Sequence, residues 1–306
     1  MRALIVGAGS VGGYFGGRLA AAKRDVSFLV RPERARQLEH GLTISSHGQD
    51  TLIPVKLLLS GQSAGEFAVI LLAVKAYQLE QAIDDLAPYV TANTMILPVL
   101  NGMQHMDRLR SRFGAERVLG GVARIATSLD VRGHIINQAG FHDLAYGEWS
   151  GERSSRILAL DEFMRGAGFA AQLSVQIERE MWEKWAMLAT LAAITCLMDA
   201  DIGRVARAPG GTAFVQSLFA EAAATVAADW RPLAEHFRSQ VLALLTDRSS
   251  TLTSSMYRDM KAGHCIEADE IVGDLVRRAA AHGVMTPLLS TVLLRLKVYA
   301  EHQSRQ

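Results

Sequence analysis

Hydrophobic residues follow two patterns along the chain, and one gives way to the other near residue 176. Before that point, short apolar runs such as residues 67–74 (FAVILLAV) alternate with stretches of helical spacing, which is typical of buried parallel strands joined by helices. After it, helical spacing continues almost throughout and strand signals vanish. The chain is therefore predicted to form an α/β domain followed by an all-helical domain.

The same pattern predicts the individual elements. Gly133 and Gly140 are expected to form turns, and a further turn is expected at residues 47–50, which begin with His47. Strands are expected at residues 3–6, 25–30, 42–45, 51–58, 67–74, 94–100, 118–125, 135–137, 143–146 and 172–176, and helices at 10–22, 79–86, 156–165, 177–198, 212–228, 232–245, 268–282 and 287–300.

Three glycines near the N-terminus are spaced Gly-x-Gly-x-x-Gly, directly after an apolar run and directly before helical signals. In a dinucleotide site the first glycine makes the tight turn, the second lets a pyrophosphate approach the backbone, and the third lets helix pack on strand. The helix then points its free N–H groups at the phosphates. A glycine-rich turn without a ligand is the alternative, which the flanking strand and helix disfavour. The predicted cofactor contacts here are Gly7, Gly9, Ser10, Val11 and Gly12.

The second predicted strand ends in Arg31, close to where a dinucleotide site contacts the adenosine ribose. An acidic residue there would accept from the ribose 2′-hydroxyl and favour NAD, whereas a guanidinium suits a 2′-phosphate. Arg34 and Arg36 follow closely. Arg31 is therefore predicted to favour NADP. The alternative is that Arg31 and Arg34 are solvated charges at the start of a helix.

Two polar residues, Lys75 and Asn101, stand where later apolar runs end. In open α/β sheets, ligands bind at the carboxyl ends of the strands. We therefore expect both residues at the same edge of the sheet as the three glycines.

Composition narrows the classes of function. The 306 residues carry a net charge of +1, which provides no electrostatic basis for binding nucleic acid or an anionic membrane. Cys196 and Cys265 lie far apart and outside any metal-ligand spacing, as in proteins of a reducing compartment. The longest uncharged apolar run, residues 185–198, is too short for a membrane span of about 20 residues, and no leader precedes the first strand. A cytoplasmic protein without a metal is expected.

Lys184 lies on a predicted helix among apolar neighbours that include Trp182 and Trp185. A lysine in such a setting either extends to water or serves a purpose. Desolvation lowers the pKa of an ammonium group, which suits a proton donor near neutral pH. Glu267 opens a later helix, where the helix dipole favours a carboxylate. From spacing alone the two need not meet, and a surface lysine with a helix-capping glutamate is an open alternative.

Seven short motifs occur along the chain. They are residues 7–9 (Gly-Ala-Gly), 74–76 (Val-Lys-Ala), 100–103 (Leu-Asn-Gly-Met), 182–184 (Trp-Glu-Lys), 254–256 (Ser-Ser-Met) followed by Asp259, 267–269 (Glu-Ala-Asp) and 282–287 (His-Gly-Val-x-Thr-Pro). In their order and approximate spacing they resemble the ketopantoate reductase (2-dehydropantoate 2-reductase) family over nearly the whole chain.

This resemblance implies a Rossmann-type NADP-binding domain (residues 1–174) and a helical substrate and catalytic domain (residues 175–306), with the substrate between them. It implies NADPH-dependent reduction of a 2-oxo acid, 2-dehydropantoate or a related keto acid, to the 2-hydroxy acid. By the same likeness Lys184 protonates the carbonyl oxygen as hydride arrives, and Glu267 orients Lys184 or the new hydroxyl. The remaining implied contacts are Lys75 and Asn101 at the nicotinamide and substrate edge, Ser255 on the substrate carboxylate and Arg31 on the 2′-phosphate.

The chain also departs from this family. Family members usually carry asparagines four and eight residues after the lysine and before Gly273, where this chain has Leu188, Ala192 and Val272. A site that hydrogen-bonds a substrate group discriminates against ligands lacking it, so losing these amides changes what fits. A divergent reductase of a less polar 2-oxo acid is one interpretation. An unchanged substrate, an NAD-dependent hydroxy-acid dehydrogenase and an NADP-binding sensor without turnover are the others, and a homodimer is left open.

Overall fold

The computed structural model describes residues 1–46 and 48–304, which form two compact units. One comprises Met1–Leu100 and His105–Glu180, and the other comprises Asn101–Gln104 and Met181–Gln306. The first unit is mixed α/β and the second is helical, which confirms the predicted fold class. The division into a cofactor domain and a substrate domain stays a prediction, because compactness does not identify ligands.

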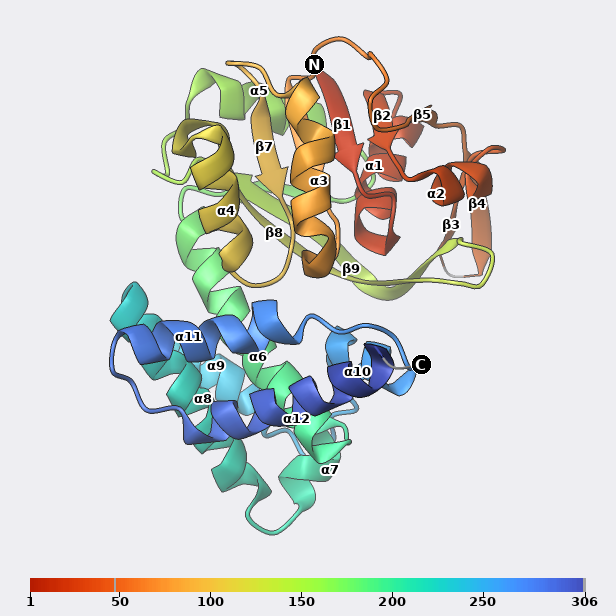
Figure 1. The fold of residues 1–306 in the computed structure, drawn as a ribbon. Coiled ribbons are helices and arrows are strands. Elements are labelled where there is room, and N and C mark those ends of the chain that lie inside the picture. The colour runs from red at the N-terminus through yellow and green to blue at the C-terminus, as the bar shows by residue number, and fades with distance from the viewer. Residues whose placement is uncertain (47, 305–306) are drawn as a thin grey trace. The chain divides into compact units, whose positions relative to one another are not determined.

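The first unit contains a parallel five-stranded sheet ordered β5-β2-β1-β6-β7 (Figure 1). Every residue of β6 and β7 is buried, which explains the uninterrupted apolar sequence of these two strands. Because the strands are parallel, their carboxyl ends share one edge. The strands are β1 (Arg2–Val6), β2 (Asp25–Leu29), β5 (Lys56–Leu58), β6 (Val69–Leu72) and β7 (Met95–Pro98).

A second sheet of the same unit is built around one long strand, β9 (Ile135–Gly147). Along one side, β9 pairs antiparallel with β8 (Gly120–Leu129). It also pairs, in parallel, with β3 (Leu42–Ser46) through its first residues and with β10 (Ala170–Leu173) through its last. At the edge, β4 (Gln49–Ile53) pairs antiparallel with β3.

Two predictions for these strands were wrong. Residues 51–58 were expected to form one strand, but Pro54 divides them: β4 joins the second sheet and β5 the first. Proline cannot donate to a ladder, so it stands between strands. Gly140 was expected to make a turn but lies inside β9, in an irregular stretch where residues 138–141 of β9 stand opposite the single residue Ala126 of β8. Of the expected turn at residues 47–50, Gln49 and Asp50 belong to β4, and His47 lies outside the described residues.

The first long helix, α1 (Ser10–Ala21), packs between the two sheets. A Cβ on Gly16 would lie 2.7 Å from Ile5 and Phe28 of the parallel sheet, whereas one on Gly17 would lie 2.9 Å from Leu42 of the other. Glycine costs about 1 kcal/mol relative to alanine inside a helix. Here its missing side chain lets both sheets close on the helix backbone.

Shorter helices complete the first unit, and the short helices α2 and α4 were not predicted. They are α2 (Pro32–Gln37), α3 (Leu79–Leu86), α4 (Gln104–Phe113), α5 (Ser155–Met164) and three 3₁₀ turns (Ala76–Gln78, Ala87–Tyr89 and Ala115–Arg117).

Helices make up the second unit, and α8 contacts four of the others (Figure 1). The predicted helix at residues 268–282 is not uniform: it opens with a π-helical turn, Asp269–Gly273, before α-helical geometry begins. The helices are α6 (Ile177–Met198), which starts in the first unit, α7 (Ile202–Arg207), α8 (Gly211–Asp229), α9 (Glu235–Leu245), α10 (Ser255–Lys261), α11 (Asp274–Ala281) and α12 (Pro287–Ser304).

Candidate active site

Three predicted cofactor segments meet at one edge of the parallel sheet in the first unit. Gly7 directly follows β1, Arg31 lies two residues beyond β2, and Lys75 lies three residues beyond β6. Since β1 lies between β2 and β6, these segments are neighbours at the carboxyl ends of the strands. Arg31 is exposed and Lys75 is half-buried.

The glycine loop at this edge has little room for side chains except at its middle position. Gly7 has φ +94°, and a Cβ there would lie 2.8 Å from Val74 Cγ1. A Cβ on Gly12 would collide with the carbonyl oxygen of Gly7 and lie 2.8 Å from Ala73 Cβ. Around Gly9, by contrast, a Cβ would meet no described atom within 4 Å.

The start of α1 fits a dinucleotide phosphate. Gly9 caps the helix without a side-chain hydrogen bond, and no acidic residue occupies the first turn. The N–H groups of such an end and its positive dipole favour an anion. Ser10 and Val11, in the first turn, are half-buried. Open space at Gly9 beside this end can admit a pyrophosphate to the backbone.

Arg34 follows Arg31 closely in the sequence, but its side chain forms hydrogen bonds within the protein. Its Nε donates to the carbonyl oxygen of Ala8 at 2.8 Å, and Nη1 donates to that of Gly133 at 2.9 Å. Burial lowers the pKa of this guanidinium. Arg34 therefore ties the glycine loop to the β8–β9 turn, a role with no local sequence signal. The exposed Arg31 is the better candidate for a ligand contact.

In the second unit, Lys184 lies on α6 and is half-buried, and in sequence it stands between two buried tryptophans. Trp182 is 5% exposed and Trp185 is 1% exposed, and their ring centroids lie 5.5 Å apart. Most of the neighbouring positions of α6, residues 181–186, are therefore buried, as expected for the helix that carries this lysine.

Glu267 is 6% exposed, and its carbonyl oxygen accepts from the N–H of Ile271, in the middle of the π-helical turn, at 3.1 Å. A carboxylate this deeply buried is uncommon without a partner or a function. Asn101 also belongs to the second unit, although it follows a strand of the first. Its neighbour Gly102 contacts the backbone of this π-helical turn, as does Trp185.

The two serines before α10 have different surroundings. Ser254 is buried, accepts from Tyr257 N at 3.0 Å as the helix cap, and shares a hydrogen bond of 2.9 Å with Thr195. Ser255 is exposed at the first helical position. Ser254 is therefore structural, and Ser255 has the hydroxyl that a ligand can reach.

The three apolar replacements are not equivalent. Ala192 is 3% exposed and Val272 is fully buried, so both pack in the interior of the helical unit. Leu188, one helical turn after Lys184, is half-buried. Of these three side chains, Leu188 is the one accessible to a ligand within this unit.

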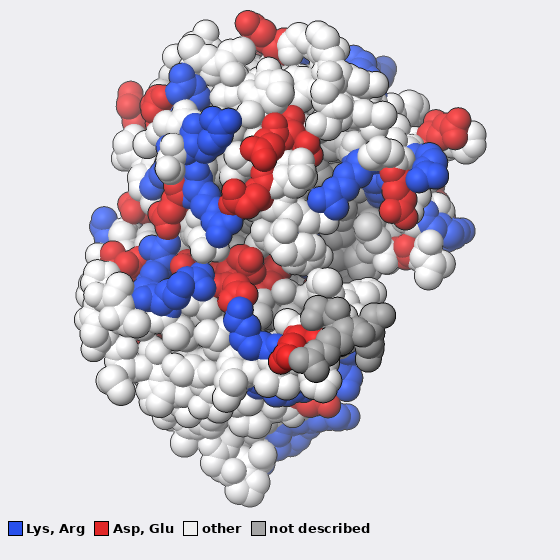
Figure 2. Space-filling view, in the orientation of Figure 1, with Lys and Arg blue, Asp and Glu red and all other residues white. Residues whose placement is uncertain are grey.

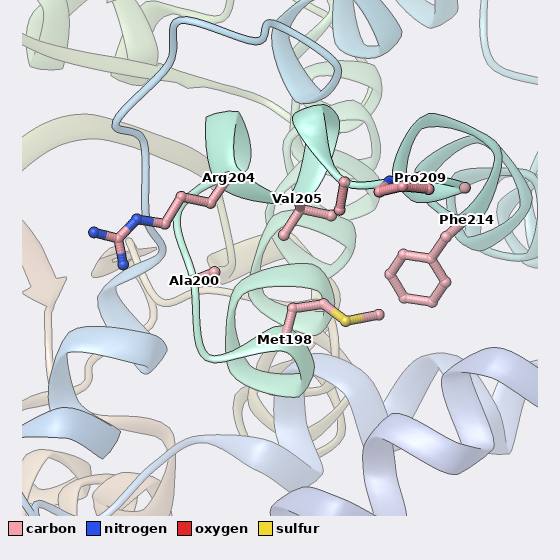
Figure 3. Close-up of a pocket in the computed structure, with 9 residues that line it drawn as sticks. Met198, Ala200, Arg204, Val205, Pro209 and Phe214 are labelled. Atoms are coloured by element: carbon pink, nitrogen blue, oxygen red, sulfur yellow. The ribbon is translucent and has the colours of Figure 1, made fainter.

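A separate surface pocket of about 390 Å³ lies at the C-terminal end of α6 (Figure 3). Met198, Val205 and Phe214 line it, whereas the guanidinium of Arg204 points away from them and lies 3.5 Å from Asp201. Met198 is about 21 Å beyond Lys184 along the helix axis, by the rise per residue. None of the predicted site residues lines this pocket.

Charge on the face shown in Figure 2 is mixed, with Lys and Arg interspersed among Asp and Glu. Across residues 1–46 and 48–304, no helix combines the length and the apolar character that crossing a membrane requires. The same residues contain no group of three or more His, Cys, Asp or Glu side chains placed to hold a metal ion.

Comparison with known proteins identifies relatives over the whole chain. The family model "Ketopantoate reductase PanE/ApbA" matches residues 3–151, and "Ketopantoate reductase PanE/ApbA C terminal" matches residues 176–300. An uncharacterized oxidoreductase of Bacillus subtilis, YkpB, is 36% identical over 300 residues, covering 98% of this chain and 99% of its own. A 2-dehydropantoate 2-reductase of Mesorhizobium japonicum is 27% identical over 96% of each chain.

The fold has close counterparts among solved structures. A PanE/ApbA family ketopantoate reductase from Ralstonia eutropha superposes with a TM-score of 0.89, at 23% identity, over 99% of this chain and 100% of its own. At that identity the likeness bears on the fold alone.

Proposed function

The chain belongs to the ketopantoate reductase family of oxidoreductases, and from this premise we propose that it reduces a 2-oxo acid to the 2-hydroxy acid with NADPH. Residues 1–174 bind the dinucleotide, and residues 175–306 provide the catalytic and substrate groups. The observation that carries the proposal is a half-buried lysine, Lys184, on a largely buried helix in a chain of this family.

Each proposed group has a defined task. When bound, the nicotinamide supplies a hydride to the carbonyl carbon. Lys184 Nζ gives a proton to the carbonyl oxygen as the C=O electron pair moves onto it, so that no free alkoxide accumulates. Glu267 orients Lys184 or the new hydroxyl, and Ser255 holds the substrate carboxylate. Lys75 and Asn101 position the nicotinamide and the substrate edge.

The preference for NADPH rests on Arg31. β2 is followed by this exposed arginine, with no carboxylate at the position that would accept from a ribose 2′-hydroxyl. A guanidinium can donate two parallel hydrogen bonds to a phosphate. Arg34 is half-buried and already holds the carbonyl oxygens of Ala8 and Gly133 through Nε and Nη1, although its buried Nη2 has no hydrogen-bond partner among the described residues.

The substrate class follows from Leu188. A side chain that can neither donate nor accept, one turn from the proposed proton donor, favours an apolar substituent on the 2-oxo acid. We propose 2-dehydropantoate or a less polar relative as the substrate. Ala192 and Val272 are too deeply buried to contact it within their own unit.

A substrate panel tests the proposal. NADPH oxidation is followed by absorbance with 2-dehydropantoate and with 2-oxo acids carrying aliphatic and aromatic substituents, each repeated with NADH. We expect NADPH-dependent turnover of at least one acid. Tight NADPH binding without turnover of any acid would contradict the proposal and favour a dinucleotide sensor instead.

A further inference from the structure

The π-helical turn Asp269–Gly273 lies directly after the segment that carries Glu267, a proposed site residue. Glu267 precedes it by two residues, and α11 follows it directly. π-Helical turns are rare, and those that are found often lie at functional sites. Such a turn exposes backbone groups that a regular α-helix would pair, so its shape depends on what the rest of the protein bonds to it.

Trp185 supplies one of these bonds. Its Nε1 donates to the carbonyl oxygen of Ile271, in the middle of the turn, at 3.0 Å, and the whole indole is 1% exposed. The ring also lies against Trp182 and beneath the guanidinium of Arg278, 5.7 Å from its centroid. Trp185 is the residue after Lys184, so this hydrogen bond links the lysine-bearing helix to the turn that follows Glu267.

Gly102 makes the second contact. A Cβ at this position would lie 2.6 Å from the carbonyl oxygen of Glu270 and 3.8 Å from Trp185 Nε1. Its φ is +84°, which side-chain-bearing residues rarely adopt. The backbone of the Asn101 segment therefore packs directly on the turn, beside the Trp185 hydrogen bond.

Two distant segments thus contact one turn, and each carries a proposed site residue directly beside its contact: Lys184 next to Trp185, and Asn101 next to Gly102. Glu267 lies two residues before the turn itself. We propose that Trp185 and Gly102 are positioning residues, which act through the π-helical turn to set the spacing of Lys184, Glu267 and Asn101. This inference rests on the proposed reductase function. Because misplacing a catalytic group by about 1 Å costs up to 10²-fold in rate, a single lost backbone contact can matter here.

The test compares two tryptophans on the same helix. Trp185→Phe keeps an aromatic ring but removes the hydrogen bond to Ile271. Trp182→Phe is the matched control: its Nε1 is also buried but has no hydrogen-bond partner among the described residues. We expect Trp185→Phe to lower kcat roughly 10- to 100-fold with KM for NADPH little changed. Trp182→Phe is expected to stay close to wild type.

The split between kcat and KM separates positioning from general damage to the fold. A positioning role lowers kcat in Trp185→Phe while its KM values and melting temperature stay close to those of Trp182→Phe. Equal kcat values for Trp185→Phe and wild type would overturn the inference.

A glycine pair tests the second contact in the same way. Gly102→Ala and Gly210→Ala impose the same backbone strain, at φ +84° and +80°, but a Cβ on Gly210 meets no described atom within 4 Å. We expect kcat to fall in Gly102→Ala alone, with melting temperatures reporting the shared strain. Equal kcat in both variants would overturn the role of Gly102. A wild-type protein inactive on every 2-oxo acid would overturn the proposed function itself, a result distinct from both.

Discussion

The glycine loop of the first unit and the π-helical turn of the second are both places where backbone is closely approached, but by different partners. The loop is crowded by its own neighbours, Val74 and Ala73, and is open at Gly9. The turn is contacted by two distant segments, through Trp185 and Gly102, whose contacts lie side by side. The loop is a local device that leaves room for a ligand, whereas the turn depends on contacts between segments far apart in the chain.

This difference separates binding from chemistry. Changes at the loop are expected to alter affinity for the dinucleotide, because its backbone faces the open position. Changes around the turn are expected to alter the rate, because the turn lies beside Glu267 and is bonded by the neighbour of Lys184. The following predictions test that separation.

The largest effect is expected for Lys184→Ala. Loss of a general acid lowers kcat about 10²- to 10⁴-fold, while NADPH affinity measured by calorimetry should stay at the wild-type value. Lys261→Ala is the control, because this lysine forms an exposed ion pair of 3.1 Å with Asp199. Retained turnover in Lys184→Ala would remove the lysine from the mechanism.

A pair of glycine variants should divide stability from binding at the loop. Gly12→Ala brings a Cβ into the carbonyl oxygen of Gly7 and should lower the free energy of unfolding by about 1–3 kcal/mol. Gly9 has φ −76° and open space, so Gly9→Ala should fold normally yet weaken NADPH binding by placing a methyl group where phosphate approaches. Thermal melts and calorimetry measure both. Undiminished NADPH affinity in Gly9→Ala would contradict a phosphate site at this loop.

Two arginines should separate cofactor choice from loop structure. Arg31→Ala is expected to weaken NADPH binding about 10-fold or more, the worth of a charge-assisted hydrogen bond, and to leave NADH binding unchanged. Arg34→Ala removes the bonds to Ala8 and Gly133 and should weaken both cofactors alike. Binding constants for both nucleotides decide this. If Arg31→Ala prefers NADPH over NADH by the same factor as the wild type, the proposed contact with the 2′-phosphate is contradicted.

The smallest effect concerns stability in acid. Burial raises the pKa of Asp229, but hydrogen bonds from Arg278 at 2.7 Å and His282 at 2.9 Å outweigh it and leave that pKa below its ordinary value. A lowered pKa gives stability that is present above the unfolded value, about 3.9, and is lost as the pH falls through the folded value. Asp229→Asn should therefore cost about 1–3 kcal/mol at pH 7 and much less at pH 3.

Urea unfolding of Asp229→Asn at the two pH values measures this loss. Glu235→Gln serves as the control, since Glu235 is exposed and its contact with Arg238 is 4.0 Å long. A cost for Asp229→Asn that does not shrink in acid would contradict this account of the Asp229 carboxylate.

The first unit was largely predictable because its signals are local. A buried strand, three spaced glycines and a helix stand next to one another in the sequence, so periodicity alone located β1 and α1. Predictions were wrong where one residue type occurs in two kinds of structure, as glycine does in turns and in strand bulges. Gly140 was expected to make a turn but lies inside β9, in a bulge of that strand where residues 138–141 stand opposite Ala126 of β8.

The contacts of the second unit could not be read in the same way. Helical spacing located α6 with both its ends, yet the hydrogen bond from Trp185 to Ile271 joins residues 86 positions apart. The π-helical turn has the apolar spacing of an ordinary helix, and Arg34 has the composition of a surface residue. The family-like motifs indicated Lys184 and Glu267 as site residues. Only the folded chain shows which residues contact the backbone beside them.

The central claim is that this chain transfers a hydride from NADPH to the carbonyl carbon of a 2-oxo acid. The most direct measurement uses NADPH with deuterium at both C4 positions and the best acid from the panel, followed by mass spectrometry of the product. The account predicts a 2-hydroxy acid with one deuterium at C2. A hydroxy acid without deuterium at C2, or no product from any acid, would contradict it.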